Sequence, residues 1–197
     1  LDTVASNVSV SGLPLTGNSF TIASSGILTF QVGENTPSSA NVSNAAQNLG
    51  MLQLEVQNDN IEKIVLDSIK VSAVDSMNAD TTVASVELYH DVNGNGTVEL
   101  ATEPKMTNSR SFVSGTATFT GLMDTLNLEA SKYYLVVYNL AGNASAGSEF
   151  SVAVSTNVDV HVTGVISGSN ASVAGMPVSG NTMTVSSFGS LNLSASD

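Results

Sequence analysis

The sequence predicts an all-β protein, an antiparallel β-sandwich of the Ig-like or Greek-key type. Apolar residues recur at every second position through much of the chain, as in residues 51–57, and a period of two is that of a strand with one buried face. Clusters of Gly, Asn, Asp and Ser interrupt these runs at short intervals, as turns do. Many short strands at this spacing are typical of a sandwich or a barrel.

The expected strands share this alternation and are bounded by turn residues. They are residues 19–22, 27–32, 51–57, 63–74, 83–90, 116–120, 133–140, 150–155 and 158–163. Near Asp67 and Ser68 the parity of the apolar positions changes, which predicts a bulge or a break between two strands. Tyr134, Val136 and Tyr138 fall on one face of their strand, and we expect that face to belong to the core or to an interface.

Helices are expected to be rare, because Ser and Thr make up about a quarter of the chain and long helix-forming side chains are sparse. Residues 39–48 lack an apolar face, and their Asn and Ser side chains compete for backbone hydrogen bonds. We interpret this segment as a loop. Residues 122–128 are the other helical candidate.

The composition excludes several classes of protein. The chain has 5 Lys and Arg residues against 17 Asp and Glu, a net charge of −12, and no Cys. The few basic residues are scattered, which argues against nucleic-acid binding. Zinc sites with Cys ligands, disulfides and thiol nucleophiles all require sulfur that is absent. No apolar run reaches the roughly 20 residues that span a membrane, so we expect a mature or excised soluble segment.

The two ends of the chain resemble each other. When residues 6–24 are aligned with residues 169–187, at a shift of 163 positions, ten of the nineteen pairs are identical. Convergence of two Ser- and Thr-rich strands is the alternative, but it would not reproduce the pattern Gly-x-Pro-x-x-Gly-Asn in register. Such self-similarity indicates a tandem repeat.

This repeat predicts one whole unit and two fragments. Residues 1–22 would be the closing strand of a preceding repeat or a donor strand, residues 23–187 the sandwich unit, and residues 188–197 the start of a following repeat. A strand without its sheet tends to pair with the sheet edge of another chain. We therefore expect copies of the chain to assemble through two matching strands, at Asn18, Phe20, Ile22, Asn181, Met183 and Val185. The alternative is a fragment cut at arbitrary points.

One segment has the spacing of a calcium loop. Asp91, Asn93 and Asn95 place oxygen-bearing side chains at alternate positions. Gly96 occupies the sixth position, where such loops turn sharply, and the Thr97 carbonyl occupies the seventh, where the backbone supplies a ligand. The sequence therefore predicts a calcium site suited to the millimolar calcium found outside cells.

The carboxylates that follow this segment depart from the usual spacing. Glu99 lies at the ninth position, Thr102 at the twelfth, where a bidentate Glu is usual, and Glu103 one residue later. We include both Glu99 and Glu103 among the candidate ligands. A plain Asn-Gly hairpin without an ion is the alternative, and sodium is another.

Catalytic signatures are missing from the sequence. His90 and His161 are too few for a three-ligand zinc site, and neither a His-Glu-x-x-His nor a Gly-x-Ser-x-Gly pattern occurs. Paired acids such as Asp75 and Asp80 are interpreted as loop surface, so we expect no enzymatic activity. Glycans are permitted at the Asn-x-Ser/Thr sequons Asn7, Asn41, Asn95, Asn143, Asn170 and Asn192.

Several of these segments together resemble the sandwich repeats of large S-layer-like or filament-forming cell-surface proteins of bacteria and archaea. The similar segments are residues 26–32, 36–37, 51–56, 83–91, 116–122 and 176–185. The resemblance implies an extracellular structural or adhesive module. Our prediction is a self-assembling subunit or repeat of a filament, fibre or surface array. The alternative is an adhesin or carbohydrate-binding module of a larger surface protein.

Overall fold

The structure, a computed structural model, describes most of the chain. The described residues are 17, 27–75 and 78–186. The assembly residues expected at Asn18, Phe20 and Ile22 lie outside them, as does the strand expected at residues 19–22. The flanking fragments lie almost entirely outside them too, so the division of the chain into one unit and two fragments stays a prediction.

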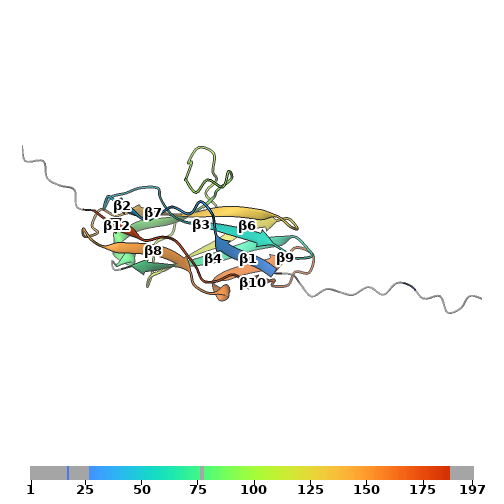
Figure 1. Cartoon of the computed structure of the whole chain (residues 1–197). Helices are drawn as coiled ribbons and strands as arrows, with labels where there is room; N and C mark the ends of the chain where they lie inside the picture. The colour runs from blue at the N-terminus through green and yellow to red at the C-terminus, as the bar shows by residue number, and fades with distance from the viewer. Residues whose placement is uncertain (1–16, 18–26, 76–77, 187–197) are drawn as a thin grey trace, which may run out of the picture.

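The chain folds into two packed β-sheets (Figure 1). Sheet A contains, in spatial order, β10 (Ser172–Ala174), β1 (Ile27–Val32), β3 (Leu49–Asn58), β7 (Ser131–Leu140) and β5 (Val83–His90). Sheet B contains, in spatial order, β2 (Ala40–Val42), β12 (Met183–Val185), β8 (Glu149–Val154), β4 (Ile64–Asp75) and β6 (Thr116–Leu126). In sheet B, β9 (Val160–Gly164) also pairs with β4, and β11 (Val178–Ser179) with β8. The predicted all-β sandwich is confirmed.

Successive strands alternate between the two sheets from β1 to β8. Most connections therefore cross from one sheet to the other, and strand neighbours come from distant parts of the chain. Most pairs are antiparallel, as predicted, but β1 pairs with β10 and β12 with β2 in parallel. These two parallel pairs join short strands at sheet edges and carry no signal in the local sequence.

The core lies between the sheets and is built from alternate residues of the strands. Tyr134, Val136 and Tyr138 of β7 are fully buried there, as the sequence predicts. The Tyr138 ring meets Phe112 edge-on at 5.4 Å and stacks on Phe150 at 6.2 Å between centroids. Each large apolar side chain buried in this way contributes about 1.5–3 kcal/mol, so the alternation itself stabilises the two-layer arrangement.

Two local expectations were wrong. Residues 122–128 are not helical, because β6 continues to Leu126 along β4, where Leu126 pairs with Ile64. Residues 39–48 are not all loop, because they contain the short strand β2. The predicted irregularity near Asp67 is a register shift between Leu66 and Ser68 within one continuous strand.

Helices are short in the described part of the chain. They are α1 (Ala79–Thr82) and the 3₁₀ turn η1 (Asn157–Asp159). No helix among the described residues has the length and hydrophobicity needed to cross a bilayer.

The described chain enters the sandwich at one end and leaves it at the other. Leu28, at the start of β1, pairs with Asn58 at the end of β3. Met183, in the last strand, lines the same pocket as Leu49 at the start of β3. Nine residue steps of β3 separate these two places, about 30 Å at the rise of a strand. Figure 1 shows the same arrangement, with β12 near one end and the start of β1, beside β10, near the other.

Replacement of Phe150 tests the core. Phe150→Ala removes a ring that is 1% exposed, and cavities of this kind cost about 3–5 kcal/mol of unfolding free energy. Urea denaturation measures the loss. Val158→Ala, at a position 90% exposed, is the control and should change stability by less than about 0.5 kcal/mol. Equal effects of the two variants would contradict the assigned core.

Candidate functional site

The predicted ion loop begins where β5 ends and lies on the outer face of sheet A. That face carries a second apolar cluster of Tyr89, Leu135 and Val137, against which Val98 of the loop packs. The Asp91 N–H donates to the Tyr133 carbonyl at 3.0 Å, which fixes the start of the loop to β7. The connection from β5 to β6 includes the yellow-green loop that projects from the sandwich in Figure 1.

The Asp91 carboxylate is the centre of the loop. It is 1% exposed and accepts three hydrogen bonds. One oxygen accepts from the Asn95 N–H at 3.1 Å. The other accepts from the Gly96 N–H at 2.9 Å and from Gln53 Nε2 at 2.6 Å. Asp91 therefore folds the loop back on itself and attaches it to β3.

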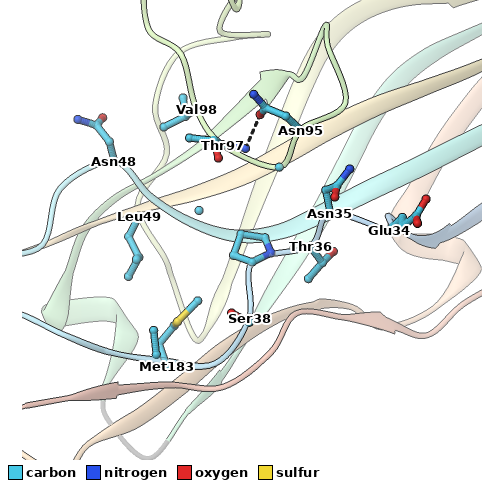
Figure 2. A pocket seen from close by; sticks show the side chains of 14 residues that line it. Glu34, Asn35, Thr36, Ser38, Asn48, Leu49, Asn95, Thr97, Val98 and Met183 are labelled. Carbon is cyan, nitrogen blue, oxygen red and sulfur yellow. Dashed lines mark hydrogen bonds between the residues drawn. The ribbon is translucent and has the colours of Figure 1, made fainter.

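The two asparagines continue this turn structure. Asn93 Oδ1 accepts from the Asn95 N–H at 3.1 Å, and Asn95 Oδ1 from the Thr97 N–H at 2.8 Å, the bond drawn in Figure 2. Both side-chain oxygens thus accept from the backbone of the loop. Gly96 has φ +73°, and a Cβ there would collide with the Asn35 carbonyl oxygen, so only glycine fits.

A single helical turn brings Glu103 back beneath the loop. The N–H groups of Thr102 and Glu103 both donate to the Glu99 carbonyl, at 3.0 and 2.9 Å. Glu103 is 4% exposed; its Oε2 accepts from the Glu99 N–H at 3.0 Å, while its buried Oε1 has no partner. Burial and the neighbouring Asp91 carboxylate raise the pKa of Glu103, against the lowering effect of the Glu99 N–H.

The other predicted carboxylate lies differently. Glu99 accepts hydrogen bonds from the side-chain amides of Asn93 and Asn95, at 3.0 and 2.6 Å, in an exposed setting. The structure therefore brings Asp91 and Glu103 together and leaves Glu99 to hold the outer side of the loop.

The tight hairpin considered as the alternative does not form. The chain returns antiparallel to β5 only after the loop, through isolated bridges between Tyr89 and Lys105 and between Val86 and Arg110. The next strand, β6, begins at Thr116 in the opposite sheet.

The carboxylates of this loop do not by themselves make a metal site. In the part of the chain that the structure describes, no three His, Cys, Asp or Glu side chains form a group able to hold a metal ion. An ion in the loop would need amide and backbone carbonyl oxygens as well as carboxylates, a mixture that calcium accepts and zinc does not favour.

A pocket of about 650 Å³ adjoins the loop (Figure 2). Three segments line it, at residues 34–38, 48–50 and 95–98, with Ala40 and Met183 beside them. Half of the residues that line it are polar. Residues 95–98 belong to the ion loop, so one wall of the pocket depends on the conformation of that loop.

Gln53 joins the pocket to the loop. It is fully buried; its Oε1 accepts from the Asn35 N–H at 2.9 Å, while its Nε2 donates to Asp91. Sequence reasoning missed this residue, because alternation assigns Gln53, Glu55 and Gln57 alike to the outer face of β3. Only the covering loop distinguishes Gln53 from the other two.

The closing strand is part of this sandwich. Met183 and Val185 are 1% and 2% exposed and lie in the main core. Their strand pairs with β2 on one side and β8 on the other, and Asn181 Nδ2 donates to the Pro37 carbonyl at 2.9 Å. Assembly through these residues stays a prediction, and it would require this strand to leave its own sheet.

The other chemistry-bearing side chains have structural contacts. His161 Nδ1 lies 3.2 Å from Asp67 Oδ2, and the His90 ring lies 5.8 Å from that of Tyr134. Asp80 accepts from the N–H groups of Ser114 and Gly115, at 2.7 and 2.8 Å. These contacts orient loops and strands of the sandwich.

Comparison with known proteins identifies the fold. The sequence matches no protein-family model and no curated protein. Among solved structures, Hadza microbial sialidase Hz136 is similar over 80% of this chain, with a TM-score of 0.52 and 14% identity. The match covers 31% of the sialidase chain, so the present chain spans about a third of its length. At this identity the similarity supports the sandwich fold alone.

Two cohesins match with lower scores. The seventh ScaB type I cohesin of Pseudobacteroides cellulosolvens has a TM-score of 0.37 and 10% identity, over 86% of this chain and 97% of its own. The type III cohesin of the cellulosomal ScaE cell-surface anchoring scaffoldin of Ruminococcus flavefaciens has a TM-score of 0.36 and 14% identity, over 82% and 87%. Scores of this size add nothing to the argument.

Gly96→Ala tests how closely the loop packs on the sandwich. The added Cβ must move Asn35 or the loop, so we expect a loss of more than about 1 kcal/mol in unfolding free energy. Gly115→Ala is the control: its φ is +70°, but a Cβ there meets nothing within 4 Å. The difference between the two midpoints of urea unfolding isolates the steric contact. Equal losses would contradict the packing of the loop.

Proposed function

We propose that the chain is a non-catalytic β-sandwich module of a larger extracellular protein, in which such modules follow one another in series as a spacer. The observation that carries this proposal is the course of the chain, which enters and leaves the sandwich at opposite ends. A module of this kind extends a polypeptide without folding it back.

The internal repeat supports a series of modules. The C-terminal copy, residues 169–187, contains the closing strands β10, β11 and β12. These strands complete both sheets, because β10 pairs with β1 and the other two with β8. Residues 6–24 match this copy, so they match the end of a sandwich. The same shift aligns residues 26–28 with residues 189–191 at the start of a next unit.

Composition supports an extracellular location. The chain is acidic, and Ser, Thr and Asn make up about a third of its residues. A net charge of −12 keeps modules soluble and discourages contact between their flanks. A structural role agrees with the use of the described carboxylates, many of which bind backbone N–H groups, as Glu62 does at Ile166 and Ser167.

A ligand-binding module is the second candidate function. The pocket beside the ion loop favours it, because its Asn, Thr, Ser and Glu side chains offer donors and acceptors to a polar ligand. Its lining contains no aromatic side chain on which a sugar ring could stack. The spacer function therefore comes first.

Small-angle X-ray scattering tests the proposed series. A polypeptide with two copies of residues 27–189, the full 163-residue period, should have a maximum dimension about 40 Å greater than one copy, the length of the 12-residue strand β4. The single copy is the control and should be a monomer. An unchanged maximum dimension, or polymers formed by the single copy, would contradict the spacer; the second result would favour strand exchange.

A further inference from the structure

We propose that the loop from Asp91 to Glu103 binds one calcium ion. The ligands would be side-chain oxygens of Asp91, Asn93 and Asn95, the Thr97 carbonyl oxygen and the Glu103 carboxylate. This inference goes beyond the spacer function and does not rest on it.

The donor set fits a hard cation. Calcium takes oxygen ligands from carboxylates, amides and backbone carbonyls, in a flexible geometry with six to eight positions. Carboxylate and amide oxygens carry two lone pairs, so Asp91, Asn93 and Asn95 can each accept an N–H and bind an ion. Their hydrogen bonds to the loop backbone therefore hold the oxygens in place and leave a lone pair on each residue available for an ion.

Glu103 is the independent sign that an ion belongs here. Its Oε1 is buried and has no hydrogen-bond partner, and its carboxylate lies against that of Asp91. Both residues are at least 96% buried. None of the ion pairs among the described residues involves either of them. Two buried carboxylates in contact repel each other and lose hydration; a divalent cation between them would supply both the opposite charge and the missing partner.

The departure from the usual loop spacing has a local cause. The helical turn that begins at Glu99 shortens the path from loop to carboxylate, so the acidic ligand comes at the thirteenth position instead of the twelfth. Glu103, and not Thr102, is therefore the proposed acidic ligand. Glu99 does not reach inward, because its carboxylate binds the amide nitrogens of Asn93 and Asn95.

A neutral partner orients the first ligand. Gln53 Nε2 donates to Asp91 Oδ2 at 2.6 Å from the buried outer face of β3. Groups that hold a metal ligand in this way fix its orientation without adding charge to the site. Because Gln53 also binds Asn35 of the pocket wall, occupation of the site would stiffen the loop and the pocket together.

Calorimetry of the whole chain, treated first with a chelator, tests the site. Titration with CaCl₂ should show one ion per chain, with a Kd of about 10⁻⁴–10⁻³ M as in extracellular modules. At about 10 mM calcium the Tm should rise by roughly 3–11 °C. Tb³⁺, a calcium mimic, should give luminescence sensitised by Tyr133, whose ring lies against Gly94, and calcium should displace it.

Two isosteric variants locate the ligand. Glu103→Gln should weaken calcium binding more than about tenfold and abolish the calcium-dependent rise in Tm. Glu129→Gln removes the same charge at an exposed position outside the loop and should leave both nearly unchanged. Circular dichroism of each variant verifies that it folds, and Asn93→Ala gives a second ligand test that leaves the buried carboxylates intact.

Three results would overturn the proposal. One is the absence of any calcium heat and Tm shift in the unaltered chain. Another is calcium binding that Glu103→Gln preserves. The third is a Tm that rises on mild acidification and ignores calcium, which would show that Asp91 and Glu103 share a proton instead of an ion.

Discussion

The outer face of sheet A carries apolar side chains that must be shielded from water, and the loop after β5 provides the cover. Leu135, Val137 and Tyr89 lie on the face opposite the main core, so this sheet must bury both of its faces. The connection after β5 covers them, and the Asp91 carboxylate bends that connection back onto β3 through Gln53. The side-chain oxygens of this loop therefore lie over the apolar outer face of sheet A.

Alternation predicted the strands that are long enough to repeat it. β1 and β5 have the predicted ends, and Tyr134, Val136 and Tyr138 of β7 lie in the main core, as the sequence predicts. The short strands β2, β10 and β11 have two or three residues and owe their existence to partners far along the chain. No periodicity can develop over such lengths, so local sequence does not contain them.

The site was predictable in its first half only. Asp91, Asn93 and Asn95 follow a fixed spacing, and the structure forms a compact turn there, in which Asp91 and Asn93 accept from the Asn95 N–H; calcium binding by this turn stays a prediction. The role of Glu103 depends on a helical turn after the loop, which folds back under contacts from the sheet. Burial of Gln53 likewise depends on tertiary cover. The comparison with solved structures supports the sandwich fold and gives no information on function. Function therefore has to be argued from this loop and from the course of the chain.

The most direct test is a crystal structure of the chain grown with calcium, with anomalous scattering recorded to locate the ion. The expected result is one ion between Asp91 and Glu103, with oxygens of Asn93, Asn95 and the Thr97 carbonyl at about 2.3–2.6 Å. Density without an ion, and with the two carboxylates joined by a short hydrogen bond, would contradict the site.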